Sequence, residues 1–231
     1  MGLILGGEFL VRGSVALARR IGVSDLFIGA VLVGFGTSAP ELVASLNAVS
    51  ADSPGIAVGN VLGSNIANIL LVLGTAAVIY PIATNPKALA RDGIFAIAAT
   101  LALAALIYFN GFASRLTGVA LFLTLVGIII YSFYSDRKQG GHSDTAELHR
   151  DEAEIMDAHV PLLLAIPMAI GGLLGIVLGA KFLIDGSVQL ARMVGLSETV
   201  IGITIIAIGT SLPELVTCVM AALKKKPDVA L

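Results

Sequence analysis

The chain has 231 residues, of which 57% are hydrophobic and 13% are charged, and its mean hydropathy is +0.96. Because a soluble domain has roughly 45–50% apolar and roughly 25% charged residues, this composition excludes a cytosolic enzyme, a nucleic-acid-binding protein and a disordered segment. The formal net charge of −2 identifies no partner, and the single cysteine, Cys218, excludes a framework of internal disulfides. We expect an all-α polytopic membrane protein.

Apolar stretches bounded by charged residues, proline or glycine predict seven membrane helices, since one span requires about 20 apolar residues. In chain order they lie near residues 2–19, 25–50, 55–80, 92–109, 114–134, 160–191 and 197–223. Between the fifth and the sixth, residues 135–159 form a polar connecting loop that is too short to be a domain.

The distribution of lysine and arginine predicts the orientation of these helices, because cytoplasmic loops carry an excess of basic residues. With seven spans, alternate connections lie on one side of the membrane, and that side carries 10 of the 14 basic residues. We therefore expect a multi-pass protein of the cell (inner) membrane, with the N-terminus outside and the 135–159 loop in the cytoplasm.

The sequence contains an internal repeat at an offset of 173 positions. Phe9–Val43 aligns without gaps with Phe182–Val216, and 19 of the 35 positions are identical. The identical positions include polar residues, since the Thr-Ser-x-Pro-Glu segment that ends at Glu41 recurs in the segment that ends at Glu214. The offset covers five helices, an odd number, so the two copies cross the bilayer in opposite directions. We expect inverted-topology repeats of five transmembrane helices, with about seven helices covered: a first repeat at 1–134, the cytoplasmic loop at 135–159 and an incomplete second repeat at 160–231.

Two acidic residues, Glu41 and Glu214, lie within otherwise apolar spans. A carboxylate at the centre of a membrane helix costs roughly 2.5–3.5 kcal/mol on insertion scales, so two at equivalent places indicate a bound cation. In a helix, side chains three and four positions before each carboxylate share its face, and these are the hydroxyls of Thr37, Ser38, Thr210 and Ser211. Pro40 and Pro213 predict kinks that free carbonyl oxygens near residues 34–36 and 207–209. Such a set of oxygen ligands suits Ca²⁺ or Na⁺.

The third span adds polar residues to an apolar helix. Ser64 and Asn68 are four positions apart and therefore lie on one face. Gly59 and Gly63, also four apart, predict a close approach to neighbouring helices. Hydrogen bonding between helices is the simpler interpretation of Ser64 and Asn68, and the two glutamate motifs favour cation binding instead.

Two charged pairs have the i, i+4 spacing of helical neighbours. Glu8 and Arg12 form one pair, and the equivalent positions of the second copy, Lys181 and Asp185, form the other with reversed signs. We expect both to be structural ion pairs, and a role in gating is the alternative.

These motifs resemble those of the prokaryotic sodium/calcium exchanger family, within the cation/calcium antiporter superfamily. Residues 36–41 followed by 59–68 are similar to the first alpha-repeat of that family, and residues 209–214 are similar to the start of the second. The resemblance implies ten membrane helices and a midplane site, without a cofactor, that binds Na⁺ and Ca²⁺ alternately as transported ions. It implies these cation ligands: Glu41, Glu214, Thr37, Ser38, Ser64, Asn68, Thr210 and Ser211, with the backbone carbonyls of Gly34 and Ala207.

The second alpha-repeat is shorter than the first in this sequence. At the offset of 173, Leu231 corresponds to Val58, so counterparts of residues 59–80 are not included. We therefore expect the chain to be truncated within the second alpha-repeat.

From these observations we expect a secondary active antiporter, not an enzyme, that exchanges Ca²⁺ for Na⁺ across the lipid bilayer by alternating access. K⁺-dependent or H⁺-coupled exchange remains open within the antiporters, and a cation channel is the alternative outside them. The repeated Thr-Ser-x-Pro-Glu segment disfavours a purely structural scaffold, because lipid would reject these polar residues. The sequence predicts no nucleic-acid partner and leaves the oligomeric state undetermined.

Overall fold

The structure is a computed structural model, and it describes the whole chain except residues 1, 24–27, 83–85, 111–113, 139–159 and 224–231. All regular elements of the described residues are helices, which agrees with the predicted all-α fold. They belong to two compact units, one formed by Met1–Ile82 with His149–Leu231 and the other by Ala83–Leu148. Of the predicted 135–159 loop, residues 135–138 are helical and extend the preceding helix, and residues 139–159 lie outside the described residues.

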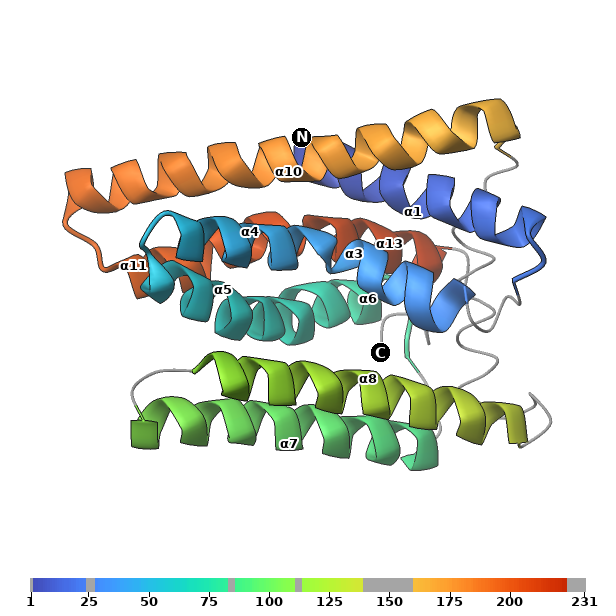
Figure 1. Ribbon diagram of the computed structural model, residues 1–231, viewed down its shortest axis with the longest axis horizontal. Helices are drawn as coiled ribbons and strands as arrows, with labels where there is room; N and C mark the ends of the chain where they lie inside the picture. The colour runs from blue at the N-terminus through green and yellow to red at the C-terminus, as the bar shows by residue number, and fades with distance from the viewer. Residues whose placement is uncertain (1, 24–27, 83–85, 111–113, 139–159, 224–231) are drawn as a thin grey trace. The chain divides into compact units, whose positions relative to one another are not determined.

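The first unit contains most of the helices, and several predicted spans are made of consecutive pieces that include π-helices, here labelled η. In chain order its elements are α1 (Gly2–Arg20), η1 (Ile28–Val33), α3 (Gly34–Thr37), α4 (Ala39–Ser50), α5 (Pro54–Ala67), η2 (Asn68–Leu73), α6 (Gly74–Ile79), α10 (Leu162–Val194), α11 (Glu198–Ile201), η3 (Gly202–Ile206), α12 (Ala207–Thr210) and α13 (Leu212–Leu223). Figure 1 shows α1 and α10 along one side of this unit, next to the layer that holds α4, α5 and α13.

The second unit consists of α7 (Pro86–Asn110) and α8 (Arg115–Lys138), which contain the spans predicted near 92–109 and 114–134. The Ser114 hydroxyl accepts a hydrogen bond from the Thr117 amide at 3.2 Å and so caps the start of α8. Large apolar side chains on both helices are exposed, such as Leu101 and Phe122. Such exposure is expected of helices whose apolar faces contact lipid.

Helix length alone identifies fewer spans than the seven that we predicted. Among the described residues, two helices are long and apolar enough to cross a membrane, Pro54–Ile79 and Leu162–Leu190. A third span results if the bent pair Glu198–Thr210 and Leu212–Leu223 is one helix. The other predicted regions are helical, but the 25–50 region is interrupted at Ser38, and α7 and α8 supply the shorter apolar segments Gly93–Phe109 and Arg115–Tyr131.

Helices α1 and α10 are antiparallel and pack through small residues. Gly2 lies against Gly179, whereas Gly13, further along α1, lies against Ala165, near the start of α10. A Cβ atom added to Gly13 would stand 2.7 Å from the Ala165 carbonyl oxygen, so the two backbones touch. This close contact is the usual packing of small residues in membrane helices. Because α1 and α10 occupy equivalent places in the two repeats, their antiparallel arrangement agrees with the predicted inversion.

The structure reproduces the repeat at the offset found in the sequence. Helices α3 and α4 (Gly34–Thr37 and Ala39–Ser50) correspond residue for residue to α12 and α13 (Ala207–Thr210 and Leu212–Leu223). The chain leaves α1 and α10 through the equivalent glycines Gly22 and Gly195, which have φ angles of +79° and +71°. A left-handed backbone is readily adopted only by glycine, which explains why both copies have it there.

Helix α5 crosses the second repeat at its own glycines. A Cβ atom on Gly59 would stand 2.9 Å from the Cα of Gly202, and one on Gly63 would overlap the Ile203 carbonyl oxygen. The predicted close approach at Gly59 and Gly63 is therefore confirmed, and it brings α5 against η3 and α12. Around this crossing, Ile56, Ile201 and Ile206 belong to the main buried cluster, together with residues of α1, α4 and α10.

Candidate cation site

Both copies of the repeated motif lie where a helix is interrupted. Ser38 separates α3 from α4, and Ser211 separates α12 from α13. Pro40 and Pro213 occupy the first turn of the following helix, where the missing amide removes no hydrogen bond within that helix. The second break bends its helix pair by 44°. The predicted interruptions are thus present, and each lies two residues before its proline.

A π-helix precedes each interruption. Residues 28–33 form η1 before α3, and residues 202–206 form η3 before α12. A third π-helix, η2, starts at Asn68, directly after α5. Such segments are rare and occur frequently at functional sites, where the wider turn changes the direction of carbonyls and side chains. No sequence pattern indicated these segments beforehand.

The two copies exchange hydrogen bonds with each other. The Ser38 hydroxyl donates to Glu214 Oε1 at 3.4 Å, and the Ser211 hydroxyl donates to Glu41 Oε1 at 3.1 Å. These two contacts are equivalent under the offset of 173. We expected each serine to share a helical face with the glutamate of its own copy. Because the helix is interrupted at the serine, that spacing does not apply, and each serine serves the glutamate of the other copy.

Three buried oxygens of this region have no hydrogen-bond donor within the described part of the chain. They are the second carboxylate oxygens of Glu41 and Glu214 and the amide oxygen of Asn68. More than nine in ten buried polar groups in proteins have a partner, so an unpartnered one requires an explanation. All three are acceptors, and a cation is the species that would satisfy acceptors gathered without donors.

Helix pieces η2 and α6 pack against α13. Val72, Ala76, Cys218 and Ala222 form one buried cluster between them. Asn68 is the first residue of η2, and Glu214 lies in the first turn of α13. The unpartnered oxygens of Asn68 and Glu214 therefore belong to two helices that contact each other.

The threonines before each serine bind the carbonyls that we predicted as ligands. Thr37 Oγ1 donates to the Gly34 carbonyl at 3.2 Å, and Thr210 Oγ1 can donate to the Ala207 carbonyl at 3.2 Å. These contacts are again equivalent at the offset of 173. Each carbonyl also accepts a backbone amide, Gly34 from Ser38 at 3.4 Å and Ala207 from Ser211 at 3.0 Å, so these two carbonyls are not freed by the interruption as we had expected.

Ser64 lies close to the second repeat but does not bind either glutamate among the described residues. Its buried hydroxyl donates to the Asn60 carbonyl at 2.7 Å within α5. The neighbouring Gly63 packs against Ala207, since an added Cβ would stand 2.6 Å from the Ala207 side chain. Ser64 therefore borders the site, while its proton is engaged in its own helix.

Asn60 is a residue of the site that the sequence did not single out. Its side chain is completely buried, and its Nδ2 donates to the Glu41 carbonyl at 3.1 Å and to Ser45 Oγ at 3.0 Å. Its Oδ1 accepts from Thr210 Oγ1 at 3.1 Å. Asn60 thus joins the two copies next to both motifs. Its position directly after Gly59 on a predicted buried helix was the one available signal, and it does not distinguish a ligand from a packing residue.

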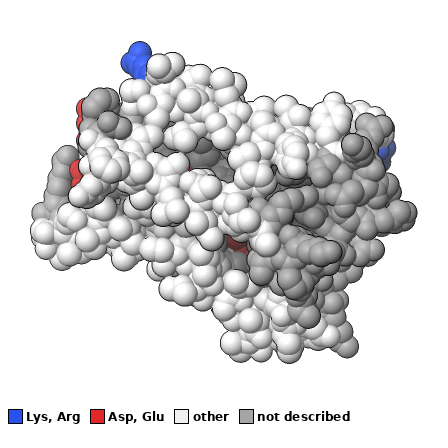
Figure 2. Space-filling model, turned by 90° about the horizontal axis from the view of Figure 1, so that it is seen from below, with Lys and Arg blue, Asp and Glu red and all other residues white. Residues whose placement is uncertain are grey.

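The candidate ligands are two carboxylates together with neutral oxygens. Within the described ranges, no three residues among histidine, cysteine, aspartate and glutamate come together as a metal-binding group. Carboxylate, hydroxyl, amide and carbonyl oxygens are the donors preferred by Ca²⁺ and by other hard cations. Charged side chains are also few on the face shown in Figure 2, where most of the described surface is uncharged.

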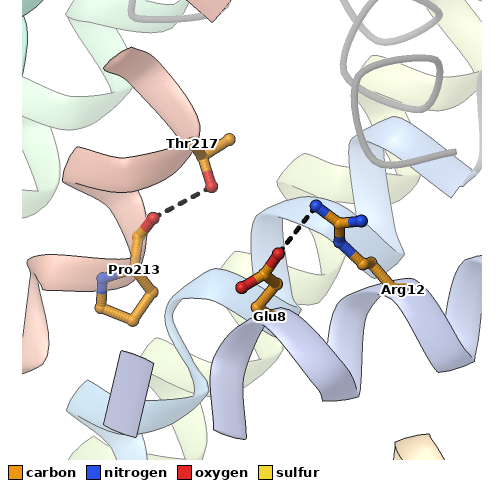
Figure 3. A network of polar contacts seen from close by, with 4 residues as sticks. All are labelled: Glu8, Arg12, Pro213 and Thr217. Atoms are coloured by element: carbon orange, nitrogen blue, oxygen red, sulfur yellow. Dashed lines mark hydrogen bonds and ion pairs between the residues drawn. The ribbon is translucent and has the colours of Figure 1, made fainter. Parts of the chain in front are cut away.

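Glu8 and Arg12 of α1 form an ion pair at 2.7 Å close to the first turns of α13 (Figure 3). On α13, the Thr217 hydroxyl donates to the Pro213 carbonyl at 3.0 Å. Gly7 faces the Pro213 ring, because a Cβ atom added to it would stand 3.2 Å away. The predicted Glu8–Arg12 pair is therefore confirmed.

The equivalent pair on α10 is not formed. Lys181 and Asp185 are both exposed, and no ion pair joins them within the described helices. The prediction of a second ion pair is therefore wrong. Spacing of i, i+4 permits such a contact, but exposed ion pairs are weak, with a median contribution of about 0–1 kcal/mol.

The fold is that of a helical membrane transporter with two inverted repeats, and oxygen atoms of both copies line the candidate cation site. The sodium/calcium exchanger protein family matches residues 1–134 and 164–231, and the chain belongs to this family. It is accordingly a multi-pass membrane protein and a cation/Ca²⁺ antiporter. Its family is one of transporters and not of enzymes.

Individual relatives agree with this assignment. The chain is 37% identical over 226 residues to the uncharacterized membrane protein MJ0091 of Methanocaldococcus jannaschii, covering 96% of this chain and 70% of that protein. It is 31% identical over 259 residues to the sodium/calcium exchanger MaX1 of Methanosarcina acetivorans, covering 99% and 74%. A solved structure of the sodium-calcium exchanger NCX_Mj superposes with a TM-score of 0.60 at 29% identity, covering all of this chain and 71% of that one.

Proposed function

We propose that this antiporter exchanges Ca²⁺ for Na⁺ by alternating access, with both ions using the site between the two repeats. The proposed ligands are the glutamates Glu41 and Glu214, the side chains of Thr37, Ser38, Ser64, Asn68, Thr210 and Ser211, and the carbonyls of Gly34 and Ala207. The observation that carries the proposal is the set of three buried acceptor oxygens, from Glu41, Glu214 and Asn68, that lack donors in the described chain.

Charge supports exchange of these two ions at one site. Two carboxylates in a region of low dielectric repel each other unless cations compensate their charge. One Ca²⁺ compensates both, and more than one Na⁺ can do the same through overlapping oxygens. Binding of one ion species then excludes the other. In this mechanism the loaded site crosses between the two sides of the membrane, whereas the empty charged site does not.

The test is Na⁺-driven Ca²⁺ uptake into vesicles that contain the reconstituted protein. We expect Glu41→Gln to lower the uptake rate more than about tenfold, because loss of an ionised ligand removes more than about 1.4 kcal/mol of binding free energy. Asp52→Asn is the matched control. It removes the same charge from an exposed residue with a φ of 55°, a conformation that asparagine tolerates. Uptake by Glu41→Gln at the rate of the unmodified protein would contradict the proposal.

Ion replacement in the same vesicles separates the alternatives. Uptake that follows a Na⁺ gradient supports Na⁺ coupling, whereas uptake that requires K⁺ or follows a pH gradient identifies K⁺-dependent or H⁺-coupled exchange. Ca²⁺ flux without any opposing ion gradient identifies a channel, although channels obtain selectivity from rings of ligands around a pore.

We also propose the membrane arrangement that accompanies this function. Residues 1–134 and 160–231 are the two repeats, the N-terminus lies outside, and the 135–159 loop lies in the cytoplasm. The antiparallel packing of α1 and α10 supports the inversion of the repeats. The excess of lysine and arginine in alternate connections supports the orientation.

A further inference from the structure

Asn60 is saturated with hydrogen bonds that cross between the repeats. Two donors of its amide nitrogen reach the Glu41 carbonyl and Ser45 Oγ in the first copy, at 3.1 and 3.0 Å. Its oxygen receives the Thr210 hydroxyl of the second copy at 3.1 Å. The side chain has no exposed surface, so water does not replace these partners.

The partners of Asn60 fix the orientation of its amide. The Glu41 carbonyl can only accept a hydrogen bond, so the amide nitrogen must face it. The amide oxygen then faces Thr210, whose hydroxyl has a single proton to donate. Ser45 completes the arrangement by accepting the second amide proton.

The Thr210 proton has three acceptors within reach. Besides the Asn60 oxygen, these are the Ile206 carbonyl at 3.1 Å and the Ala207 carbonyl at 3.2 Å. Since one proton makes one strong hydrogen bond, the acceptor that receives it sets the direction in which the two lone pairs of Thr210 Oγ1 point. In the first copy, the Thr37 hydroxyl donates to the Gly34 carbonyl, which is the equivalent of Ala207.

We propose that Asn60 is a positioning residue of the cation site, which accepts the hydrogen bond of the Thr210 hydroxyl and so orients the lone pairs of Thr210 Oγ1 toward a cation. This inference rests on the proposed function, because it assigns a task to a residue that does not itself contact the ion. The Glu41 carbonyl and Ser45 Oγ anchor the amide of Asn60 in the first copy and so keep its oxygen facing Thr210.

A double-mutant cycle tests whether Asn60 acts through Thr210. We would measure the dissociation constant of Ca²⁺ by isothermal titration calorimetry on the purified full chain, with Asn60→Leu, Thr210→Val and both changes together. Leucine has the same number and branching of side-chain heavy atoms as asparagine and cannot form its hydrogen bonds. We expect each single change to raise the dissociation constant about tenfold, the upper end for one lost hydrogen bond, and the double change to raise it about tenfold as well.

Additive effects would overturn the inference. If the double variant binds Ca²⁺ about a hundredfold more weakly, the two residues act independently, and Asn60 has a separate structural role. Unchanged affinity of Asn60→Leu would overturn it too. If Asn60→Leu does not fold, Ser45→Ala replaces it in the cycle, since it removes one anchor of the amide. We expect Ser45→Ala to raise the Ca²⁺ dissociation constant about threefold in the unmodified background and to leave it unchanged in the Thr210→Val background.

Two controls distinguish a failure of the proposed role of Asn60 from a failure of the proposed function. Asn65→Leu changes the same residue type on the same helix, but Asn65 is exposed and bonds only the Val61 carbonyl of α5, so Ca²⁺ affinity is expected to stay unchanged. Glu41→Gln tests the proposed function itself. If Glu41→Gln binds Ca²⁺ normally, the proposed site is wrong. If Glu41→Gln loses binding and the Asn60–Thr210 cycle is additive, only the role of Asn60 is wrong.

Discussion

Two adjacent glycines of α10, Gly171 and Gly172, provide a sharp test of how α1 and α10 pack. A Cβ atom on Gly172 would stand 2.6 Å from the Gly6 carbonyl oxygen and 2.8 Å from the Leu10 Cα, both of which are backbone atoms of α1. A Cβ atom on Gly171 would meet no atom within 4 Å. Both residues lie inside the same helix, so alanine gains the same helix propensity at both.

Alanine at Gly172 is expected to force the two helices apart. Ordinary van der Waals contact begins at 3.4 Å, so the 2.6 Å approach to the Gly6 oxygen, with the Leu10 backbone nitrogen nearer still, requires a local separation of at least about 0.8 Å that flexible side chains cannot absorb. Overpacking of this kind lowers the free energy of unfolding by about 1–3 kcal/mol. Because the gain in helix propensity cancels between the two sites, Gly172→Ala is expected to be about 1–3 kcal/mol less stable than Gly171→Ala.

The measurement is unfolding in mixed micelles with increasing dodecyl sulfate, followed by far-ultraviolet circular dichroism because the chain has no tryptophan. Gly172→Ala should unfold at lower dodecyl sulfate than the unmodified protein, whereas Gly171→Ala should unfold at the same concentration or a higher one. Equal midpoints of the two variants would refute the backbone contact between α1 and α10. A lower midpoint for Gly171→Ala alone would reverse the assignment of the buried face.

Three further predictions concern the Ser53–Glu198 hydrogen bond, the serines of the repeated motif and the orientation in the membrane. Ser53→Ala removes the donor that reaches Glu198 Oε1 at 3.0 Å and should lower the free energy of unfolding by about 1–2 kcal/mol, with Ser50→Ala, an exposed serine bonded within its own helix, as the unaffected control. Ser211→Ala should raise the Ca²⁺ dissociation constant more than Ser38→Ala, because its contact of 3.1 Å is shorter than the other of 3.4 Å; the reverse order would contradict the geometry. In a Cys218→Ala background, a membrane-impermeant thiol reagent added to intact cells should label Asp52→Cys, and Ser143→Cys only after permeabilisation; the opposite pattern would invert the proposed orientation.

The repeat made much of the fold predictable from the sequence. An ungapped offset requires equivalent backbones, and the structure has the boundaries of α3 and α4 repeated in α12 and α13. The same comparison found Gly22 and Gly195, whose positive φ explains why both are glycine. Proline chemistry also predicted the interruptions, since a residue without an amide hydrogen cannot continue a helix beyond its first turn.

The contacts within the candidate site were less predictable. Helical spacing placed Ser38 beside Glu41, but spacing applies only inside a continuous helix, and the interruption at Ser38 directs its hydroxyl to Glu214. Asn60 has no counterpart within the aligned segments, so the repeat could not mark it, and its role depends on the approach of α5 to α12. The π-helices depend on tertiary packing in the same way, because no residue type requires them.

The exchange of serines between the copies relates ion binding to movement. Each glutamate accepts a hydrogen bond from the other copy, through Ser38 to Glu214 and Ser211 to Glu41, so neither copy holds its carboxylate alone. A cation bound by both carboxylates therefore stabilises the relative position of α4 and α13. In that position the two serines and the two glutamates remain in contact. Removing the cation leaves two close carboxylates whose repulsion favours other positions. Because a ligand shifts a conformational equilibrium only through different affinities for its states, this shared ligation gives the proposed exchange a physical basis within the described residues.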